Sequence, residues 1–336
     1  MTKSKTKTTK QANELAQRSV AQLGRQVSQT LKNFPSLNLP RRDWRQVVVC
    51  GMGGSALAAD FLRYSLWQRL RRPVIIVNNY QLPKFVDRQS LVVISSYSGS
   101  TEEAISCYRQ ARRQGLTMVV LTAGGHLTKL AKTDKVPLVL FDTKYNVSGA
   151  PRLGLGYSIA ALVALVQQLG LSSFRQADLL KLIRFLRTPK DLPIKQLSGR
   201  SVIVVASEHL IGGAHVFCNQ LNESAKVFAA YFALPEMNHH LLEGFGSLKN
   251  RKDWVVIFLE SANYSKRLTR RYQLTKAIVK KYGLPVYEQK FSGPVMAEAF
   301  KLLAWSSQLT LALAKAKGLN SLAIPWVDYF KKRLVN

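Results

Sequence analysis

The sequence predicts an α/β protein built from two doubly wound, parallel-sheet domains in tandem. Five short apolar runs in the first half alternate with segments whose apolar residues are spaced as in helices. Runs that are apolar on both faces are typical of parallel strands covered by helices on both sides. The order strand, glycine-containing loop, helix at 46–65 recurs at 201–224, and the run at 253–261 corresponds to the run at 90–98. A second, diverged copy of the same domain explains this repetition.

Each element follows from its local pattern. The expected strands of the first half are 46–50, 74–78, 91–95, 118–122 and 137–141. The expected helices are 55–70, 101–114, 126–132, 154–169 and 174–187, and later 296–317 and 325–335. Prolines at 189 and 193 flank Asp191 and mark a linker. The predicted organisation is therefore residues 1–39 as a basic tail with an N-terminal helix, 40–188 as the first domain and 194–336 as the second.

The ends and the cysteines indicate the class of protein. Residues 1–11 are rich in Lys and Thr and lack apolar side chains to bury, so they are expected to be disordered. They also lack the apolar core of a signal peptide, and no run approaches the ~20 apolar residues of a membrane span. Three separated cysteines, Cys50, Cys107 and Cys218, lie in apolar runs and are expected to be reduced. These features predict a cytoplasmic protein with no structural zinc site and no membrane partner.

The charge balance is strongly basic. The chain has 49 Lys and Arg against 19 Asp and Glu, a formal net charge of +30. Such a field attracts anions, whether phosphorylated metabolites, membrane surfaces or nucleic acid. The basic residues are scattered, as in "RLTRRYQ" and "FKKRL", and form no known nucleic-acid-binding motif. A nucleic-acid partner is left open by the charge alone, and a solvated basic surface is the simpler interpretation.

The first glycine-rich loop has two interpretations. The stretch "CGMGGSA" places Gly51, Gly53 and Ala56 at the spacing of a dinucleotide-binding loop. That interpretation also requires an acidic residue at the end of the second strand, to hold the ribose. The strand ends instead at Asn78 and Asn79. Binding of another phosphate at the start of the following helix is therefore favoured over a dinucleotide.

A cluster of hydroxyl groups after the third strand supports phosphate binding. Around Gly99 the sequence has five hydroxyl side chains in seven residues: Ser95, Ser96, Ser98, Ser100 and Thr101. They precede a helix, and the free N–H groups of a helix start bind phosphate. The alternative is ordinary capping of that helix, which needs only one hydroxyl. The number of hydroxyls favours a ligand.

These motifs together resemble a known family. "GMGGSALAAD" and "SYSGSTEEA" are similar to the sugar isomerase (SIS) domain, a flavodoxin-like phosphosugar-binding sandwich. Further stretches, "NNYQLPKFV", "GAPRLGLGY", "NQLNESAK" and "LPEMNHHLLEGF", resemble the bifunctional phosphoglucose/phosphomannose isomerases, which carry two SIS domains. The resemblance covers about residues 40–336. It implies a hexose-6-phosphate substrate, no cofactor and no metal, a homodimer with shared active sites, and a place in glycolysis and gluconeogenesis.

The resemblance also assigns roles to individual residues. It implies that Glu223 moves the proton between C1 and C2 of the sugar, and that Arg152 stabilises the enediolate between these steps. His239 and Lys331 align with the ring-opening residues of the family, although His240 and Lys332 are direct neighbours of each. The phosphate-binding set that it implies is Gly54, Ser55, Ser96, Ser98 and Thr101. Without the resemblance, Glu223 is a surface helix residue that pairs with Lys226.

The expected range of sugar substrates depends on a threonine that the C-terminal region lacks. Family members that accept mannose-6-phosphate are thought to use a threonine near the C-terminus, but the last threonine here is Thr310 and the stretch 320–327 has none. Exchange of glucose-6-phosphate and fructose-6-phosphate is therefore the main expectation, with mannose-6-phosphate as a further substrate left open. A phosphosugar sensor without catalysis, a dinucleotide-dependent oxidoreductase and a nucleic-acid-binding protein are the alternatives.

Overall fold

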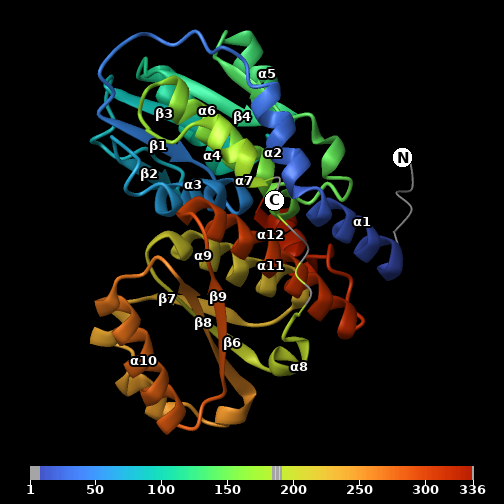
Figure 1. The fold of residues 1–336 in the computed structure, drawn as a ribbon. Helices are drawn as coiled ribbons and strands as arrows, with labels where there is room; N and C mark the ends of the chain where they lie inside the picture. Colours follow the sequence, from blue (N-terminus) through green and yellow to red (C-terminus); the bar gives the residue numbers. More distant parts are fainter. Residues whose placement is uncertain (1–7, 184–185, 187–188, 190, 335–336) are drawn as a thin grey trace. The chain divides into compact units, whose positions relative to one another are not determined.

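The structure is a computed structural model that describes residues 8–183, 186, 189 and 191–334. The chain divides into two compact units (Figure 1). The first unit is Gln22–Leu186, and the second combines Met1–Ala21 with Arg187–Asn336. Each unit contains one parallel β-sheet, which confirms the predicted tandem of parallel-sheet α/β domains.

The first sheet has the strand order β2-β1-β3-β4-β5, and every neighbouring pair is parallel. This is the flavodoxin-like order, in which the chain reverses direction across the sheet between β1 and β3. The strands are β1 (Gln46–Cys50), β2 (Val74–Val77), β3 (Ser90–Ser96), β4 (Met118–Thr122) and β5 (Leu138–Leu140). All five predicted strands are confirmed. Every residue of β3 is buried, as expected for a central strand covered on both faces.

Helices cover both faces of this sheet. Alternate strand residues such as Val48, Val92 and Val120 pack against α4 (Glu102–Arg113) and α5 (Gly125–Thr133). On the other side lie α3 (Gly54–Ser65) and α6 (Leu155–Gln168), which contact each other. The helix α6 is apolar and buried on all sides from Leu155 to Val166, so it needs a further layer. Its contact with α2 (Leu23–Lys32) provides that layer.

The second sheet has four parallel strands in the order β7-β6-β8-β9. The strands are β6 (Ser201–Ala206), β7 (Ala229–Ala233), β8 (Trp254–Ser261) and β9 (Val286–Phe291). The helices α9 (Ile211–Gln220) and α11 (Val295–Ala316) pack together on one face, and α10 (Lys266–Lys281) lies on the other (Figure 1). Because β6 has neighbours on both sides, this sheet repeats the reversal of the first sheet.

The N-terminal segment differs from the expectation. Residues 1–7 of the tail lie outside the described residues, but Thr9, Lys10 and Gln11 begin the helix α1 (Thr9–Ala21). The expectation of disorder up to residue 11 is therefore wrong for these three residues. The cause is local: Thr8 Oγ1 accepts from the Gln11 amide at 3.3 Å, and the Gln11 side chain accepts from the Thr8 amide at 3.2 Å, which is a capping box at the start of the helix. The helix α1 then packs on α11, whereas α2 packs on α6. Each of these two amphipathic helices covers an apolar helix of its own unit.

The remaining elements are short or terminal. The helix α7 (Gln176–Ile183) is described over part of the predicted 174–187 range; positions 184, 185 and 187 lie outside the described residues. The linker residues Pro189, Asp191 and Pro193 have no regular secondary structure, and α8 (Ile194–Leu197) follows. The chain ends in α12 (Pro325–Leu334). Among the described residues, no helix combines the length and apolar character that a bilayer-spanning segment needs.

Candidate active site

The crevice of a doubly wound sheet is the place outside the carboxyl ends of the strands where the chain direction reverses, and in the first sheet this place lies between β1 and β3. The loops that follow β1 and β3 leave neighbouring strands at the same edge of the sheet and open the helices α3 and α4. Ligands of doubly wound sheets bind at this position, outside the carboxyl ends of the strands. The glycine loop and the hydroxyl cluster, which were predicted separately, therefore meet at one place.

Glycines allow the backbones of this crevice to approach closely. A Cβ atom at Gly51 would lie 2.6 Å from the carbonyl oxygen of Ser95, and one at Gly54 would lie 3.2 Å from that of Pro151. Gly99 has φ of +67°, and a Cβ atom there would lie 1.8 Å from the carbonyl oxygen of Gly124. A side chain at Gly51 or Gly99 would force the backbone to shift, and one at Gly54 would be tight. The loops after β1, β3 and β4 and the segment around Arg152 thus pack backbone against backbone.

The hydroxyl groups are held by one another and by amides. The hydroxyls of Ser96 and Thr101 are 2.8 Å apart, and Ser96 Oγ also accepts from the Gly99 amide at 3.1 Å. Ser98 Oγ accepts from the amide of Ser100 at 3.3 Å. Thr101 is the N-cap residue of α4, yet its side chain makes no capping hydrogen bond. Helix capping therefore does not account for the Thr101 hydroxyl. The first backbone N–H groups of α4 have no acceptor within the helix, as at any helix start.

Ser55 links the two loops. It lies in the first turn of α3 and is buried, and its Oγ accepts from the Tyr97 amide at 3.1 Å. Asn78, at the end of β2, donates to the Gly51 carbonyl oxygen at 2.8 Å. Asn78 thus stands where a dinucleotide site has its acid, and its amide holds the glycine loop.

Arg152 is buried in the short helical turn Pro151–Leu153, which contacts α3. Two buried residues that the sequence analysis missed support its segment. Asn146 donates to the Tyr97 hydroxyl at 2.8 Å and to the Ala150 carbonyl oxygen at 3.0 Å. Gln26 donates to the Leu153 carbonyl oxygen at 3.0 Å and accepts from the Gly156 amide at 3.2 Å. Burial raises the pKa of Tyr97, although its hydrogen bond to Asn146 opposes this, so the phenol stays neutral.

Glu223 lies in the second unit, on the π-helical turn Leu221–Ala225 that ends α9. It is half-buried, and π-helical turns are frequent at functional sites. Two ammonium groups satisfy the carbonyls that end this helix. Lys226 Nζ donates to the carbonyl oxygens of Glu223 and Ala323, and Lys317 Nζ donates to those of Ala225 at 3.0 Å and Lys226 at 3.2 Å. Cations suit this negative end of the helix dipole, and here they fix the turn that carries Glu223.

His239 follows the other end of β7. It is exposed on the turn Glu236–His239, while its neighbour Asn238 accepts from Arg271 at 3.2 Å and donates to Thr275 at 2.8 Å. Glu223 precedes β7 and His239 follows it, so the length of this strand, about 16 Å at ~3.3 Å per residue, separates their turns. A single chain therefore holds the turns of Glu223 and His239 at opposite ends of β7.

Lys331 lies on α12, a helix with no buried residue. Lys331 and Lys332 are both exposed. Arg152 and the predicted phosphate-binding residues belong to the first unit, whereas Glu223, His239 and Lys331 belong to the second.

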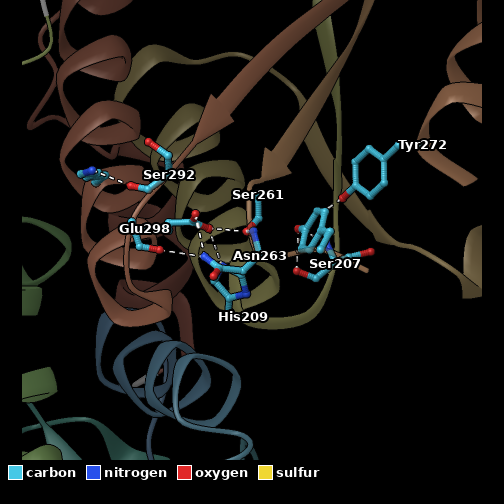
Figure 2. A network of polar contacts seen from close by, with 10 residues as sticks. Ser207, His209, Ser261, Asn263, Tyr272, Ser292 and Glu298 are labelled. Carbon is cyan, nitrogen blue, oxygen red and sulfur yellow. Dashed lines mark hydrogen bonds and ion pairs between the residues drawn. The ribbon is translucent and has the colours of Figure 1, made fainter. Parts of the chain in front are cut away.

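The equivalent edge of the second sheet is filled by polar side chains that bond one another. Figure 2 shows Glu298 between His209, Ser261 and Asn263. His209 Nε2 lies 2.8 Å from Glu298 Oε2, Asn263 Nδ2 donates to Glu298 Oε1 at 2.9 Å, and Ser261 donates to Glu298 as well. Glu298 is completely buried and His209 is 5% exposed. Every carboxylate oxygen is satisfied from within the protein, and no hydroxyl cluster is offered to a ligand here.

No metal site accompanies these residues in the part of the chain that the structure describes. It contains no group of three His, Cys, Asp or Glu side chains arranged for an ion. The three cysteines are buried free thiols, and burial raises the pKa of Cys218.

Comparisons with known proteins agree with this architecture. Residues 42–137 match the SIS domain family, and residues 192–334 match the bacterial phospho-glucose isomerase C-terminal SIS domain. The bifunctional phosphoglucose/phosphomannose isomerase of Caldicellulosiruptor bescii is 28% identical over 316 residues, which cover 89% of this chain and 92% of that protein. The protein of the same description from Aquifex aeolicus is 26% identical, over 87% of this chain and 91% of its own length.

A solved structure shows the same fold. The glucosamine-6-phosphate deaminase of Thermotoga maritima superimposes with a TM-score of 0.68 at 14% sequence identity, covering 93% of this chain and 97% of that one.

Proposed function

We propose that this chain, which belongs to the bifunctional phosphoglucose/phosphomannose isomerase family, interconverts glucose-6-phosphate and fructose-6-phosphate. The family name extends the proposal to mannose-6-phosphate as a second substrate. The alternative of a dinucleotide-dependent oxidoreductase is not favoured. The two relatives described above are isomerases, and Asn78 lies where a dinucleotide site has its ribose-binding acid. The proposal includes a cytoplasmic location, a role in glycolysis and gluconeogenesis, and catalysis without a cofactor.

The observation that carries the proposal is the hydroxyl arrangement at the β1/β3 edge. Ser96 and Thr101 bond each other instead of capping α4, next to the free N–H groups of the helix start. In the proposed complex the sugar phosphate accepts from the hydroxyls of Ser55, Ser96, Ser98 and Thr101 and from the backbone at Gly54. The phosphate then anchors the sugar, and binding energy remote from the reacting carbons orients them.

The proposed chemistry moves one proton between two carbons. After His239 and Lys331 have opened the ring, Glu223 takes the proton from C2 of the aldehyde form. The C2–H electron pair becomes the C1–C2 double bond, and the carbonyl electrons move to O1. Arg152 stabilises the resulting enediolate, as a fixed guanidinium does for developing negative charge. Return of the proton to C1, with a proton passing from O2 to O1, gives the ketose.

The separation of Glu223 and His239 supports a shared site in a homodimer. The two residues flank opposite ends of β7, so a single chain offers them at different places. His239 is exposed, as a residue that serves a second chain must be in the isolated subunit. We propose that His239 of each subunit completes the site of the other, in a symmetric dimer.

Solvent exchange of the C2 hydrogen of glucose-6-phosphate in deuterium oxide tests the function without any added reagent. Glu223→Gln keeps the shape of the side chain and removes the base, so exchange and turnover should fall together by about 10²- to 10⁴-fold, with substrate binding largely kept. Glu243→Gln, at an exposed position, is the matched control and should leave both rates unchanged. A wild-type protein that binds hexose-6-phosphates but catalyses no exchange would be a sensor.

The same assay tests the shared site. A mixture of Glu223→Gln and His239→Ala chains should recover about a quarter of the wild-type rate, because half of the random dimers hold one intact site. No recovery after subunit exchange, or full activity of a monomer in light scattering, would contradict the shared site while leaving the isomerase proposal intact.

A further inference from the structure

A cavity of about 290 Å³ lies in the second unit between α10 and the segment that follows β7. Three guanidinium groups line it, from Arg267, Arg270 and Arg271 on successive turns of α10. The rest of its lining is formed by the apolar side chains of Leu242, Leu274 and Ile278, together with Asn238 and Thr275. The cavity thus combines concentrated positive charge with an apolar floor.

The positive charges of the three arginines lie at the helix end that disfavours cations. The N-terminal end of a helix favours anions, yet the first turn of α10 has no acidic residue and the three arginines lie within its first two turns. Arg267 also lies three and four positions before the other two, where like charges repel each other. An anion bound among the three groups would remove both penalties.

The arginines are not neutralised by the protein. Among the described residues none of the three forms an ion pair: Arg271 donates to Asn238 at 3.2 Å, and Arg270 donates to Gln273 at 3.3 Å. Further along the same helix, by contrast, Lys276 pairs with Glu260 at 2.7 Å and with Glu288 at 2.8 Å. The helix therefore carries paired cations at one end and a cation cluster free for a ligand at the other.

We propose that this cavity binds an organic polyphosphate, of the class of nucleoside di- and triphosphates. A guanidinium fork binds phosphate oxygens in pairs, and three forks suit more than one phosphoryl group. The apolar floor suits a flat organic body such as a nucleobase, which inorganic phosphates lack. This cavity shares no residue with the hydroxyl crevice of the first unit, although Asn238 in its lining is the direct neighbour of His239. We therefore expect the polyphosphate and the sugar phosphate to occupy separate sites.

Titration calorimetry of the full chain with ADP, at about 50 mM salt, tests the proposal. Wild type should bind ADP, and Arg267→Ala/Arg270→Ala should bind it at least tenfold more weakly. Lys280→Ala/Lys281→Ala removes the same charge from exposed positions of the same helix outside the cavity, and should change the affinity less than twofold. Equal weakening by both double variants would reveal diffuse attraction by the basic surface and overturn the site.

Two further arms identify the ligand. Saturating fructose-6-phosphate should leave the affinity for ADP unchanged; competition would place ADP in the sugar-phosphate crevice and overturn the proposal. Pyrophosphate should bind at least fivefold more weakly than ADP, because it makes no use of the apolar floor. Pyrophosphate binding as tight as ADP would overturn the organic ligand. Binding of a single-stranded oligonucleotide without binding of ADP would also overturn the proposal, because it would show a nucleic-acid-binding surface.

Discussion

The carboxyl edges of the two sheets have the same topology and opposite contents. At the first, hydroxyl groups and the N–H groups of a helix start lie among loops that glycines allow to pack closely. At the second, a buried carboxylate, a histidine and two further side chains satisfy one another (Figure 2). A crevice that binds a ligand must leave hydrogen-bonding groups unsatisfied by protein, whereas a structural network must satisfy them all.

The two units share a fold, but their sheet edges have different roles: we propose ligand binding at the first, and the second is a structural network. The polar groups at the second edge bond one another, and the candidate catalytic residues of this unit, Glu223 and His239, lie before and after β7. The two edges are therefore expected to respond differently to mutation: the second by loss of stability, the first by loss of substrate affinity.

The largest expected effect is at the second edge. Glu298→Ala removes the common partner of His209, Ser261 and Asn263 and leaves buried polar groups unpaired. We expect a loss of about 3–5 kcal/mol in the free energy of unfolding, as for other broken buried pairs. Urea unfolding measures this loss, with Glu243→Ala at an exposed position as the control. If the variant kept its stability and lost affinity for fructose-6-phosphate, the second edge would be a ligand site too.

At the first edge the expected effect is smaller and functional. Ser96→Ala with Thr101→Val should raise the Michaelis constant for fructose-6-phosphate about 10- to 100-fold, since a hydrogen bond to a charged group contributes about 1.5–3 kcal/mol. The melting temperature should change little, because the Gly99 amide still donates to the Ser96 carbonyl oxygen at 3.1 Å. Ser100→Ala, at an exposed position in the same loop, is the control for steady-state kinetics. Unchanged kinetics in the double variant would return these hydroxyls to a structural role.

The smallest expected effect is a pH dependence of stability that comes from Glu288 on β9. Burial alone raises the pKa of Glu288, but the hydrogen bond and charge of Lys276 outweigh it, so the pKa lies below its usual value. A lowered folded-state pKa stabilises the protein above the unfolded value of about 4.3 and loses this contribution as pH falls through the folded value. Since Glu288 is partly exposed, the contribution is at most about 1 kcal/mol.

Thermal unfolding of wild type and Glu288→Gln checks this prediction. The variant should be less stable at pH 7, and the difference should disappear as the pH approaches 3. Glu236→Gln, an exposed residue near His240, should show a much smaller difference at any pH. A difference for Glu288→Gln that persists unchanged at pH 3 would mean that the side chain acts through packing rather than charge.

The sequence predicts those strands that contain consecutive large apolar or β-branched residues. The runs "QVVVC" and "MVVLT" each contain three β-branched residues and became β1 and β4 at the predicted positions. The strands β7 and β9 were missed because "AAYFA" and "VYEQKF" lie at the two edges of their sheet, half-exposed, where apolar patterning is weak. The end of the N-terminal tail was misjudged although its signal is local: Thr8 and Gln11 accept from each other's backbone amides, at the spacing of a capping box.

For the candidate site, local patterns were sufficient where the chemistry itself is local. The glycine loop and the hydroxyls of 95–101 are consecutive residues at a strand–helix junction, so the sequence alone determined this crevice. Gln26 supports the segment of Arg152 from more than a hundred residues away, and His209 and Glu298 lie 89 residues apart. Only the tertiary structure could decide these contacts, because an unremarkable polar residue gains a role when folding buries it beside a partner, and the energy of that pairing depends on the burial.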